Sequence, residues 1–199
     1  MTLFNNFEDL CDYVNVNEDS RLIGDSIIRN QLDEFCSRAP RRRRRHCIPG
    51  GTLDDVTAAC DDISQDANEN TLFLIHVGTN DIQRTRSEAL LQKYREMIRR
   101  YKEKSNNVII SGILPRINAD RLFYNKAFST NARLVNLCKE EGVRFVNLWN
   151  DFYNQEILYN DDGLHLNEVG SARLGRLFHD AVVAHLAKNA SQPARPETT

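Results

Sequence analysis

Two short segments of the sequence contain residues that could bind or stabilise a negative charge. Ser26 follows Gly24-Asp25 and precedes a segment, residues 27–36, that we expect to be one helix. A serine at a strand-to-helix turn can project its hydroxyl beside the helix N-terminus, where the helix dipole favours an anion. Gly50 lies in Pro49-Gly50-Gly51-Thr52, where a glycine lets the backbone approach a ligand and offer its N–H. Taken alone, each is better explained by local structure, Ser26 as a helix N-cap and Gly50 as a turn glycine.

A third segment is Gly78-Thr79-Asn80-Asp81. The amide of Asn80 can donate an N–H to an anionic centre, and the carboxylate of Asp81 can accept from backbone donors of a neighbouring loop. Asn and Asp are also common turn residues, so this segment is weak evidence by itself.

The fourth segment, Asp162-Gly163-Leu164-His165, places a carboxylate three residues before an imidazole. This spacing lets the two side chains meet on one side of a tight turn. A carboxylate on one ring nitrogen fixes the tautomer and leaves the other nitrogen as a general base. Asp161 adjoins Asp162, but the three-residue spacing selects Asp162 as the partner of His165.

The remaining histidines and the cysteines predict no metal site and no disulfide framework. The five cysteines are an odd number, are widely spaced and form no Cys-x-x-Cys pair. The other histidines lack a neighbouring carboxylate at this spacing and are interpreted as structural or surface residues: His46, His76, His179 and His185.

The elements that must position these residues are short apolar runs that alternate with helical periods. Alternation of this kind predicts a parallel sheet with helices on both faces, and ligands bind at the carboxyl ends of such strands. The first three polar segments each follow a predicted strand, whereas the fourth precedes the last helix. The predicted strands are Arg21–Gly24, Arg43–Ile48, Thr71–Val77, Val108–Gly112 and Val143–Leu148.

The second predicted strand begins inside a run of five arginines: Arg41, Arg42, Arg43, Arg44 and Arg45. The formal net charge is −2, so the rest of the chain carries −7 once these five charges are removed. We expect an edge strand whose outward arginines form a basic patch. Such a patch could bind RNA phosphates or an anionic membrane surface, at about 1 kcal/mol per charge. A solvated edge that discourages strand pairing is the more common explanation.

In this order, the four segments resemble the blocks of the SGNH (GDSL-type) hydrolases, a family named for conserved Ser, Gly, Asn and His. The resemblance extends from about Arg21 to Ala187 and has Ile27 where the family usually has Leu. The matching segments are Gly24-Asp25-Ser26-Ile27, Gly50, Gly78-Thr79-Asn80-Asp81 and Asp162-Gly163-Leu164-His165.

The resemblance implies a three-layer α/β/α, flavodoxin-like sandwich with a central five-stranded parallel sheet. It also implies a carboxylic ester hydrolase with an open site for small acyl esters and no metal or organic cofactor. Chemistry and resemblance agree on the roles: Ser26 as nucleophile, His165 as base, Asp162 to orient it, and an oxyanion hole from Ser26, Gly50 and Asn80. Gly51 is an alternative to Gly50, and the supporting residues are Asp25, Gly78 and Asp81.

Four longer runs resemble one branch of the family, the esterase domain of the first-open-reading-frame proteins of vertebrate LINE retrotransposons. That resemblance implies a longer parent protein, with self-association and RNA-binding parts outside this chain. The runs are Leu22 to Arg29, Cys47 to Gly50, Ile75 to Asp81 and Ser111 to Pro115.

Length and composition favour one soluble domain. Of the 199 residues, 41% are hydrophobic and 27% charged, a globular balance. We expect an N-terminal extension over residues 1–19, a hydrolase domain over 20–188 and a disordered tail or linker over 189–199. Neither a signal peptide nor an apolar run of about 18 residues is visible. With the unpaired cysteines, this predicts an intracellular, cytoplasmic protein.

Three functions remain open at this stage. The first is a serine esterase acting on short-chain acyl esters, including those of lipids. The second is a lipid- or RNA-binding module of a retrotransposon particle in which catalysis is vestigial. The third is a carbohydrate O-acetyl esterase.

Overall fold

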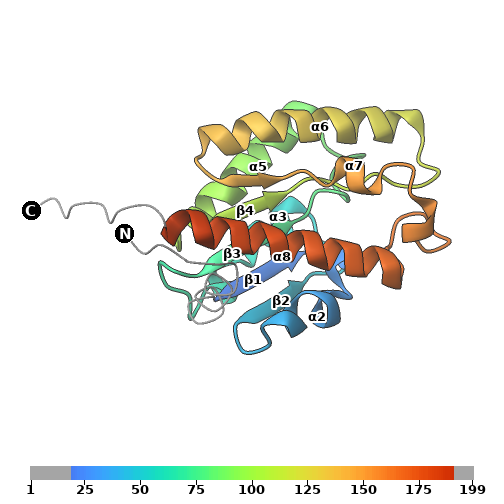
Figure 1. Cartoon of the computed structure of the whole chain (residues 1–199). Coiled ribbons are helices and arrows are strands. Elements are labelled where there is room, and N and C mark those ends of the chain that lie inside the picture. Colours follow the sequence, from blue (N-terminus) through green and yellow to red (C-terminus); the bar gives the residue numbers. More distant parts are fainter. Residues whose placement is uncertain (1–18, 191–199) are drawn as a thin grey trace, which may run out of the picture.

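The central element is a five-stranded, fully parallel sheet in the order β2-β1-β3-β4-β5. The structure is a computed structural model and describes residues 19–190 (Figure 1). The predicted fold class is confirmed, and the strand bounds differ from the predicted ones by one or two residues. The strands are β1 (Ser20–Gly24), β2 (Arg43–Cys47), β3 (Leu72–His76), β4 (Val108–Ser111) and β5 (Arg144–Val146).

Helices cover both faces of the sheet, because its central strands β1, β3 and β4 are buried on both sides. All five residues of β3 are buried. Ile75 packs into one core with α3 to α6, whereas Leu74 packs into a second core with η1, η2 and α8. The helices are η1 (Ser26–Ile28), α2 (Gln31–Glu34), η2 (Cys36–Arg38), α3 (Leu53–Ala58), α4 (Cys60–Ile63), α5 (Ser87–Lys102), α6 (Arg121–Glu140), α7 (Trp149–Phe152), η3 (Glu156–Leu158) and α8 (Glu168–Ala190).

The register of the three strands on the β2 side aligns their carboxyl ends. Gly24, the last residue of β1, pairs with Cys47 at the end of β2 and with His76 at the end of β3. The segments that follow these three strands therefore begin at the same edge of the sheet.

The segment after β1 differs from the single helix expected over residues 27–36. It is divided into η1, α2 and η2. The Asp25 carboxylate caps η1 by accepting from the N–H of Ile27 at 2.9 Å, and the buried Gln31 donates its amide to the carbonyl of Ser171 in α8 at 3.0 Å. These contacts stabilise short pieces against α8 in place of one continuous helix.

The arginine run is also arranged differently from the expectation. Arg43 does not face outward: its side chain is buried, with the guanidinium 4.4 Å from the ring centroid of Phe35. Arg44 is exposed and forms an ion pair with Asp66 at 2.6 Å. The patch of five outward arginines is therefore wrong for Arg43, because alternate residues of a strand point to opposite faces.

The predicted N-terminal extension and C-terminal tail fall almost wholly outside the described residues. Residues 19, 189 and 190 are the exceptions, and the last two continue α8. Between residues 19 and 190, the structure contains no helix with both the length and the apolar character that a membrane span requires.

Candidate active site

Ser26, His165 and Asp162 form one hydrogen-bonded chain at the carboxyl edge of the sheet. Ser26 Oγ lies 2.9 Å from His165 Nε2, and His165 Nδ1 lies 2.6 Å from Asp162 Oδ2. Because a carboxylate only accepts, Nδ1 carries the proton in the neutral imidazole and Nε2 is left to accept from the serine hydroxyl. Ser26 follows β1, and Asp162 and His165 lie in the loop before α8. Residues more than 130 positions apart in the sequence thus meet at this edge of the sheet.

The Asp162 carboxylate is fixed by its own turn. Its Oδ1 accepts from the N–H of Leu164 at 2.9 Å and from the N–H of His165 at 2.8 Å. The hydrogen bond from the His165 ring and these two backbone bonds lower the pKa of Asp162 to about 2. The carboxylate is therefore ionised and oriented, although about half of its side-chain surface (49%) remains exposed.

The backbone conformation after β2 distinguishes Gly50 from Gly51. The N–H of Gly51 donates to the carbonyl of Ile48 at 2.8 Å, so it is occupied within the turn. Neither Gly50 nor Ser26 has a backbone N–H bonded to any described residue. Gly50 adopts a φ of +71°, in the left-handed region that favours glycine.

Asn80 and Asp81 connect the loop after β3 to the loop after β2. Asn80 Nδ2 donates to the carbonyl of Gly51 at 2.9 Å, and Asp81 Oδ2 accepts from the N–H of Leu53 at 3.1 Å. An amide nitrogen carries two hydrogens, so the second N–H of Asn80 remains available to a ligand.

Gly78 is required by the close packing beneath that loop. Its φ is +114°, and a Cβ there would lie 2.0 Å from the hydroxyl of Tyr94. That hydroxyl donates to the carbonyl of Val77 at 2.6 Å. A side chain at position 78 would displace Tyr94 and with it the loop that carries Asn80.

Asp25 is a buried carboxyl directly before Ser26. Burial raises its pKa to about 6, against the lowering effects of the Ile27 N–H bond, His165 and Arg116. Its Oδ1 caps η1, whereas its Oδ2 is buried with no hydrogen-bond partner among the described residues. Asp25 thus supports the Ser26 turn, with a partly unsatisfied carboxyl.

His76 has an internal structural role at the end of β3. Its Nδ1 lies 2.8 Å from Ser111 Oγ, which in turn donates to the carbonyl of Ile75 at 3.1 Å. The ring is fully buried, and burial lowers its pKa to about 4. His76 is therefore neutral and does not contact the chain formed by Ser26 and His165.

Arg116 is a residue near the site that the sequence did not single out. One Nη lies 3.4 Å from the carbonyl of Thr79, and its guanidinium stacks 4.5 Å from the ring centroid of Phe123. Burial lowers its pKa, while the charge of Asp25 raises it. The motif Leu-Pro-Arg that follows β4 is the only sequence signal, since it places a cation just past the end of a strand.

A cavity of about 270 Å³ opens beside Ser26 and His165. Polar side chains from two segments contribute to its lining, namely Arg29, Asn30 and Asn160. No group of three or more His, Cys, Asp or Glu side chains capable of holding a metal ion occurs in the described part of the chain.

Comparison with known proteins identifies the class to which this fold and site belong. Residues 22–173 match the family model of the GDSL-like lipases and acylhydrolases. The chain belongs to this family, and it is accordingly a carboxylic ester hydrolase. No curated protein sequence matches the chain.

Solved structures share the fold at low sequence identity. A GDSL-like lipase from Bacteroides thetaiotaomicron superposes with a TM-score of 0.69 and 19% identity, over 89% of this chain and 98% of that one. The acetyl xylan esterase AlAXEase gives a TM-score of 0.66 and 17% identity, over 82% and 99%. The esterase domain of the zebrafish ZfL2-1 retrotransposon ORF1 protein gives 26% identity but a TM-score of 0.40, over 87% and 99%.

Proposed function

We propose that the protein is a serine esterase that hydrolyses short-chain acyl esters through Ser26, His165 and Asp162. The observation that carries this proposal is the continuous hydrogen-bonded chain of 2.9 Å and 2.6 Å through these three side chains. Membership of a family of ester hydrolases supports the same chemistry.

The first step is attack of Ser26 Oγ on the ester carbonyl carbon. His165 Nε2 removes the hydroxyl proton as the C–O bond forms, and the imidazolium is stabilised by Asp162. The pKa of Asp162 is lowered to about 2, so its carboxylate is ionised and this stabilisation is available at neutral pH.

The negative charge on the former carbonyl oxygen is held by three donors. They are the unoccupied backbone N–H groups of Ser26 and Gly50 and the second N–H of Asn80. Each donor of this kind contributes about 3 kcal/mol to stabilisation of the transition state. The hydrogen bonds of Asn80 and Asp81 to the Gly50 loop keep the donors in place before the substrate binds.

Collapse of the intermediate breaks the bond to the leaving alcohol. His165 donates its proton to that oxygen, leaving an acyl group on Ser26 and a neutral imidazole. A water molecule then repeats the attack with His165 as the base, which releases the carboxylic acid and restores the Ser26 hydroxyl.

The size and lining of the cavity favour a short acyl group. About 270 Å³ lined by Arg29, Asn30 and Asn160 offers little apolar surface for a long alkyl chain, and apolar burial is what binds such chains. The preferred substrates are therefore acetyl to short-chain acyl esters.

The direct test is hydrolysis of p-nitrophenyl esters of increasing acyl length by the wild type and by Ser26→Ala. We expect turnover of the acetate ester that decreases as the chain lengthens and is absent in the variant. Equal rates for wild type and a folded Ser26→Ala protein would reject the proposal.

A carbohydrate O-acetyl esterase is the second candidate. The polar side chains around the cavity suit a hydroxylated alcohol better than a lipid, and one structural neighbour is an acetyl xylan esterase. A panel of acetylated xylo-oligosaccharides, triacetin and short-chain lysophospholipid analogues separates the candidates. A carbohydrate enzyme would turn over the first group with a markedly higher kcat/KM.

We further propose, from the four sequence runs of the LINE-like branch, that the domain derives from a retrotransposon first-open-reading-frame protein. A reverse-transcriptase reading frame encoded directly downstream in the genome would support this origin. An intron-containing locus with no such frame nearby would contradict it.

Contact of the arginine run with RNA or an anionic membrane stays a prediction. Arg41 and Arg42 are its exposed members without an ion pair in the described structure. Replacing both by Gln should weaken sedimentation with anionic vesicles or retention of RNA at low salt. Unchanged binding would remove the run from consideration.

A further inference from the structure

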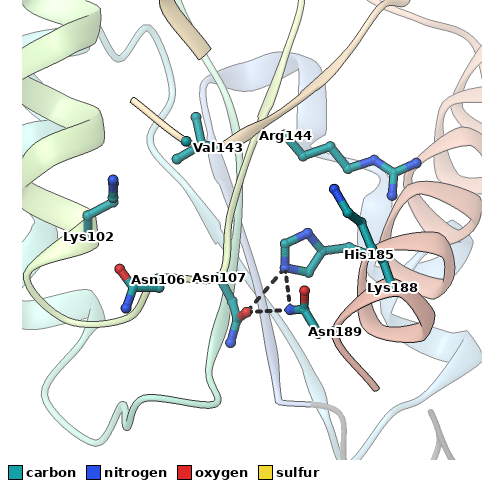
Figure 2. A pocket seen from close by; sticks show the side chains of 9 residues that line it. Lys102, Asn106, Asn107, Val143, Arg144, His185, Lys188 and Asn189 are labelled. Atoms are coloured by element: carbon teal, nitrogen blue, oxygen red, sulfur yellow. Dashed lines mark hydrogen bonds between the residues drawn. The ribbon is translucent and has the colours of Figure 1, made fainter. Parts of the chain in front are cut away.

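A second cavity lies at the amino ends of the strands, opposite to Ser26. It has a volume of about 1010 Å³. Asn107 precedes β4 and Arg144 begins β5, so the cavity lies at the amino ends of these strands. The C-terminal ends of α5 and α8 close its sides (Figure 2).

The lining is basic and contains no acidic side chain. Three cations from three different elements face it: Lys102 at the end of α5, Arg144 in β5 and Lys188 in α8. Figure 2 shows the Arg144 side chain extending toward α8 and the Lys188 side chain pointing back toward β5. Side chains from separate elements thus bring positive charge to one hollow.

The acidic residues nearest in sequence to Lys102 and Arg144 form ion pairs with arginines that do not line the cavity. Glu103 pairs with Arg100 at 2.5 Å, and Glu140 pairs with Arg95 at 2.8 Å. Glu141 accepts from Arg95 and Arg99 at 2.5 Å and 2.9 Å. These carboxylates are therefore not free to neutralise the cavity.

Arg144 and Lys188 have no acidic partner within ion-pair distance in the described part of the molecule. Helix dipoles explain part of the pattern, because cations are stabilised near the C-terminal ends of helices. Lys102 fits that explanation, since its ammonium donates to the carbonyl of Glu141. Arg144 lies on a strand, and no carboxylate among the described residues pairs with its guanidinium.

Polar groups beside the cations are held in fixed positions. Asn107 Oδ1 lies 3.2 Å from His185 Nε2 and accepts from Asn189 Nδ2 at 2.8 Å. Burial, with the charges of Arg144 and Lys188, lowers the pKa of His185 to about 4. His185 is therefore neutral at physiological pH, and the positive charge of the cavity does not depend on its titration.

We propose that this cavity binds the phosphate group of an organic phosphate, with Arg144 and Lys188 as the charged contacts. Guanidinium and ammonium groups are the usual protein partners of phosphate. A volume of about 1010 Å³ is far larger than a bare phosphate needs and is at the upper end of small-molecule pockets. No Phe, Tyr or Trp side chain lines the cavity, so the large aromatic platform on which single-stranded RNA bases stack is missing.

The proposal goes beyond ester hydrolysis, because the two sites lie at opposite edges of the sheet and share no residue. It predicts binding that is independent of Ser26. The phosphate could belong to a soluble metabolite or to a lipid headgroup, and the experiment therefore uses AMP, inorganic phosphate and vesicles of phosphatidylcholine containing phosphatidic acid.

The test is a titration of the full chain followed by amide chemical shifts in ¹H–¹⁵N spectra. AMP should produce saturable shifts at residues 142–144 and 185–189, and Lys188→Gln should weaken its affinity by about tenfold, as expected for loss of one charge-assisted hydrogen bond. Arg41→Gln is the matched control, because it removes one exposed charge beside β2, the outer strand farthest from β5 in the sheet. It should bind AMP as the wild type does.

Lys188 is exposed on a helix, so Lys188→Gln is expected to fold, and Arg144→Lys tests whether retaining the charge in β5 retains binding. Binding of the phosphatidic acid vesicles alone, lost in Lys188→Gln, would assign the phosphate to a lipid headgroup. The proposal is overturned if all three probes leave these amides unshifted. It is also overturned if Lys188→Gln binds as tightly as the wild type.

Discussion

The charged groups at the two ends of the parallel strands, the carboxyl edge and the amino edge of the sheet, differ in whether they have partners within the chain. At the carboxyl edge, Asp162 accepts hydrogen bonds from two backbone N–H groups and from His165, so its charge is balanced within the chain. At the amino edge, Arg144 and Lys188 face a cavity without an acidic partner among the described residues. A carboxylate whose hydrogen bonds are satisfied within the chain suits a site that acts on neutral esters. Cations without an acidic partner suit a site that binds an anion from outside the protein.

The strongest way to separate the two edges is His165→Ala. Loss of the general base should lower kcat for p-nitrophenyl acetate by about 10³-fold or more, with AMP binding unchanged. Lys188→Gln should give the reverse pattern in the same two assays. Loss of both ester hydrolysis and AMP binding in either variant would indicate that the two sites are not independent.

Asn80→Ala should produce the next largest effect. Removal of one oxyanion donor costs about 10² to 10³ in kcat, with KM changed far less, because the donor acts on charge that develops in the transition state. Steady-state kinetics measure this directly. If the variant has a higher KM with kcat unchanged, Asn80 acts in substrate binding instead. Asn80→Asp is a control of similar size that substitutes an acceptor for the donor.

Asp25→Asn should change the pH dependence of the free energy of unfolding, because it replaces a buried carboxyl at the carboxyl edge. Because the pKa of Asp25 is raised from 3.8 to about 6, the protonated carboxyl stabilises the fold below its ordinary pKa, and this contribution is lost as the pH rises through 6. Asn keeps the acceptor for the Ile27 N–H without a charge. We expect the variant to gain at most about 3 kcal/mol at neutral pH.

Urea unfolding at two pH values on either side of that window is the measurement for Asp25→Asn. The wild type should lose stability between them, and the variant should lose much less. Identical pH profiles for the two proteins would mean that Asp25 is not the group responsible.

The smallest predicted difference between the two edges is in the salt dependence of AMP binding and of ester hydrolysis. Raising the ionic strength shortens the range of exposed charges, so AMP affinity should decrease several-fold between about 0.05 and 0.5 M salt, whereas hydrolysis of a neutral ester should change by less than about twofold. Assays of both in the same buffers make the comparison. Equal sensitivity would argue against a charge-based difference.

The sequence was informative wherever a local pattern determines the structure. Apolar runs predicted the strands β3, β4 and β5 because parallel strands need apolar residues on both faces, and β3 is buried throughout. The segments with Ser26, Gly50 and Asn80 were placed at one edge by topology alone, whereas His165 was assigned through its spacing from Asp162 and the family resemblance. The family resemblance favoured Gly50 over Gly51, and the physical reason, that the turn occupies the N–H of Gly51, is visible only in three dimensions.

Other features depend on contacts between distant segments and gave no local signal. Arg43 is buried against Phe35, although an arginine run normally indicates a solvated surface. The single helix expected after β1 is divided, because Asp25 caps η1 and Gln31 bonds to α8. The basic cavity joins three elements, and none of its cations belongs to the arginine run that the sequence made conspicuous.

The most direct test of the central claim is covalent trapping of the nucleophile. The wild type is treated with diethyl p-nitrophenyl phosphate, and the modified residue is identified by peptide mass spectrometry. Ser26 attack should release one nitrophenolate per chain and leave a diethylphosphoryl group on Ser26, at a rate greatly reduced in His165→Ala. An unmodified protein, or modification of a residue other than Ser26 with ester hydrolysis lost, would contradict the account.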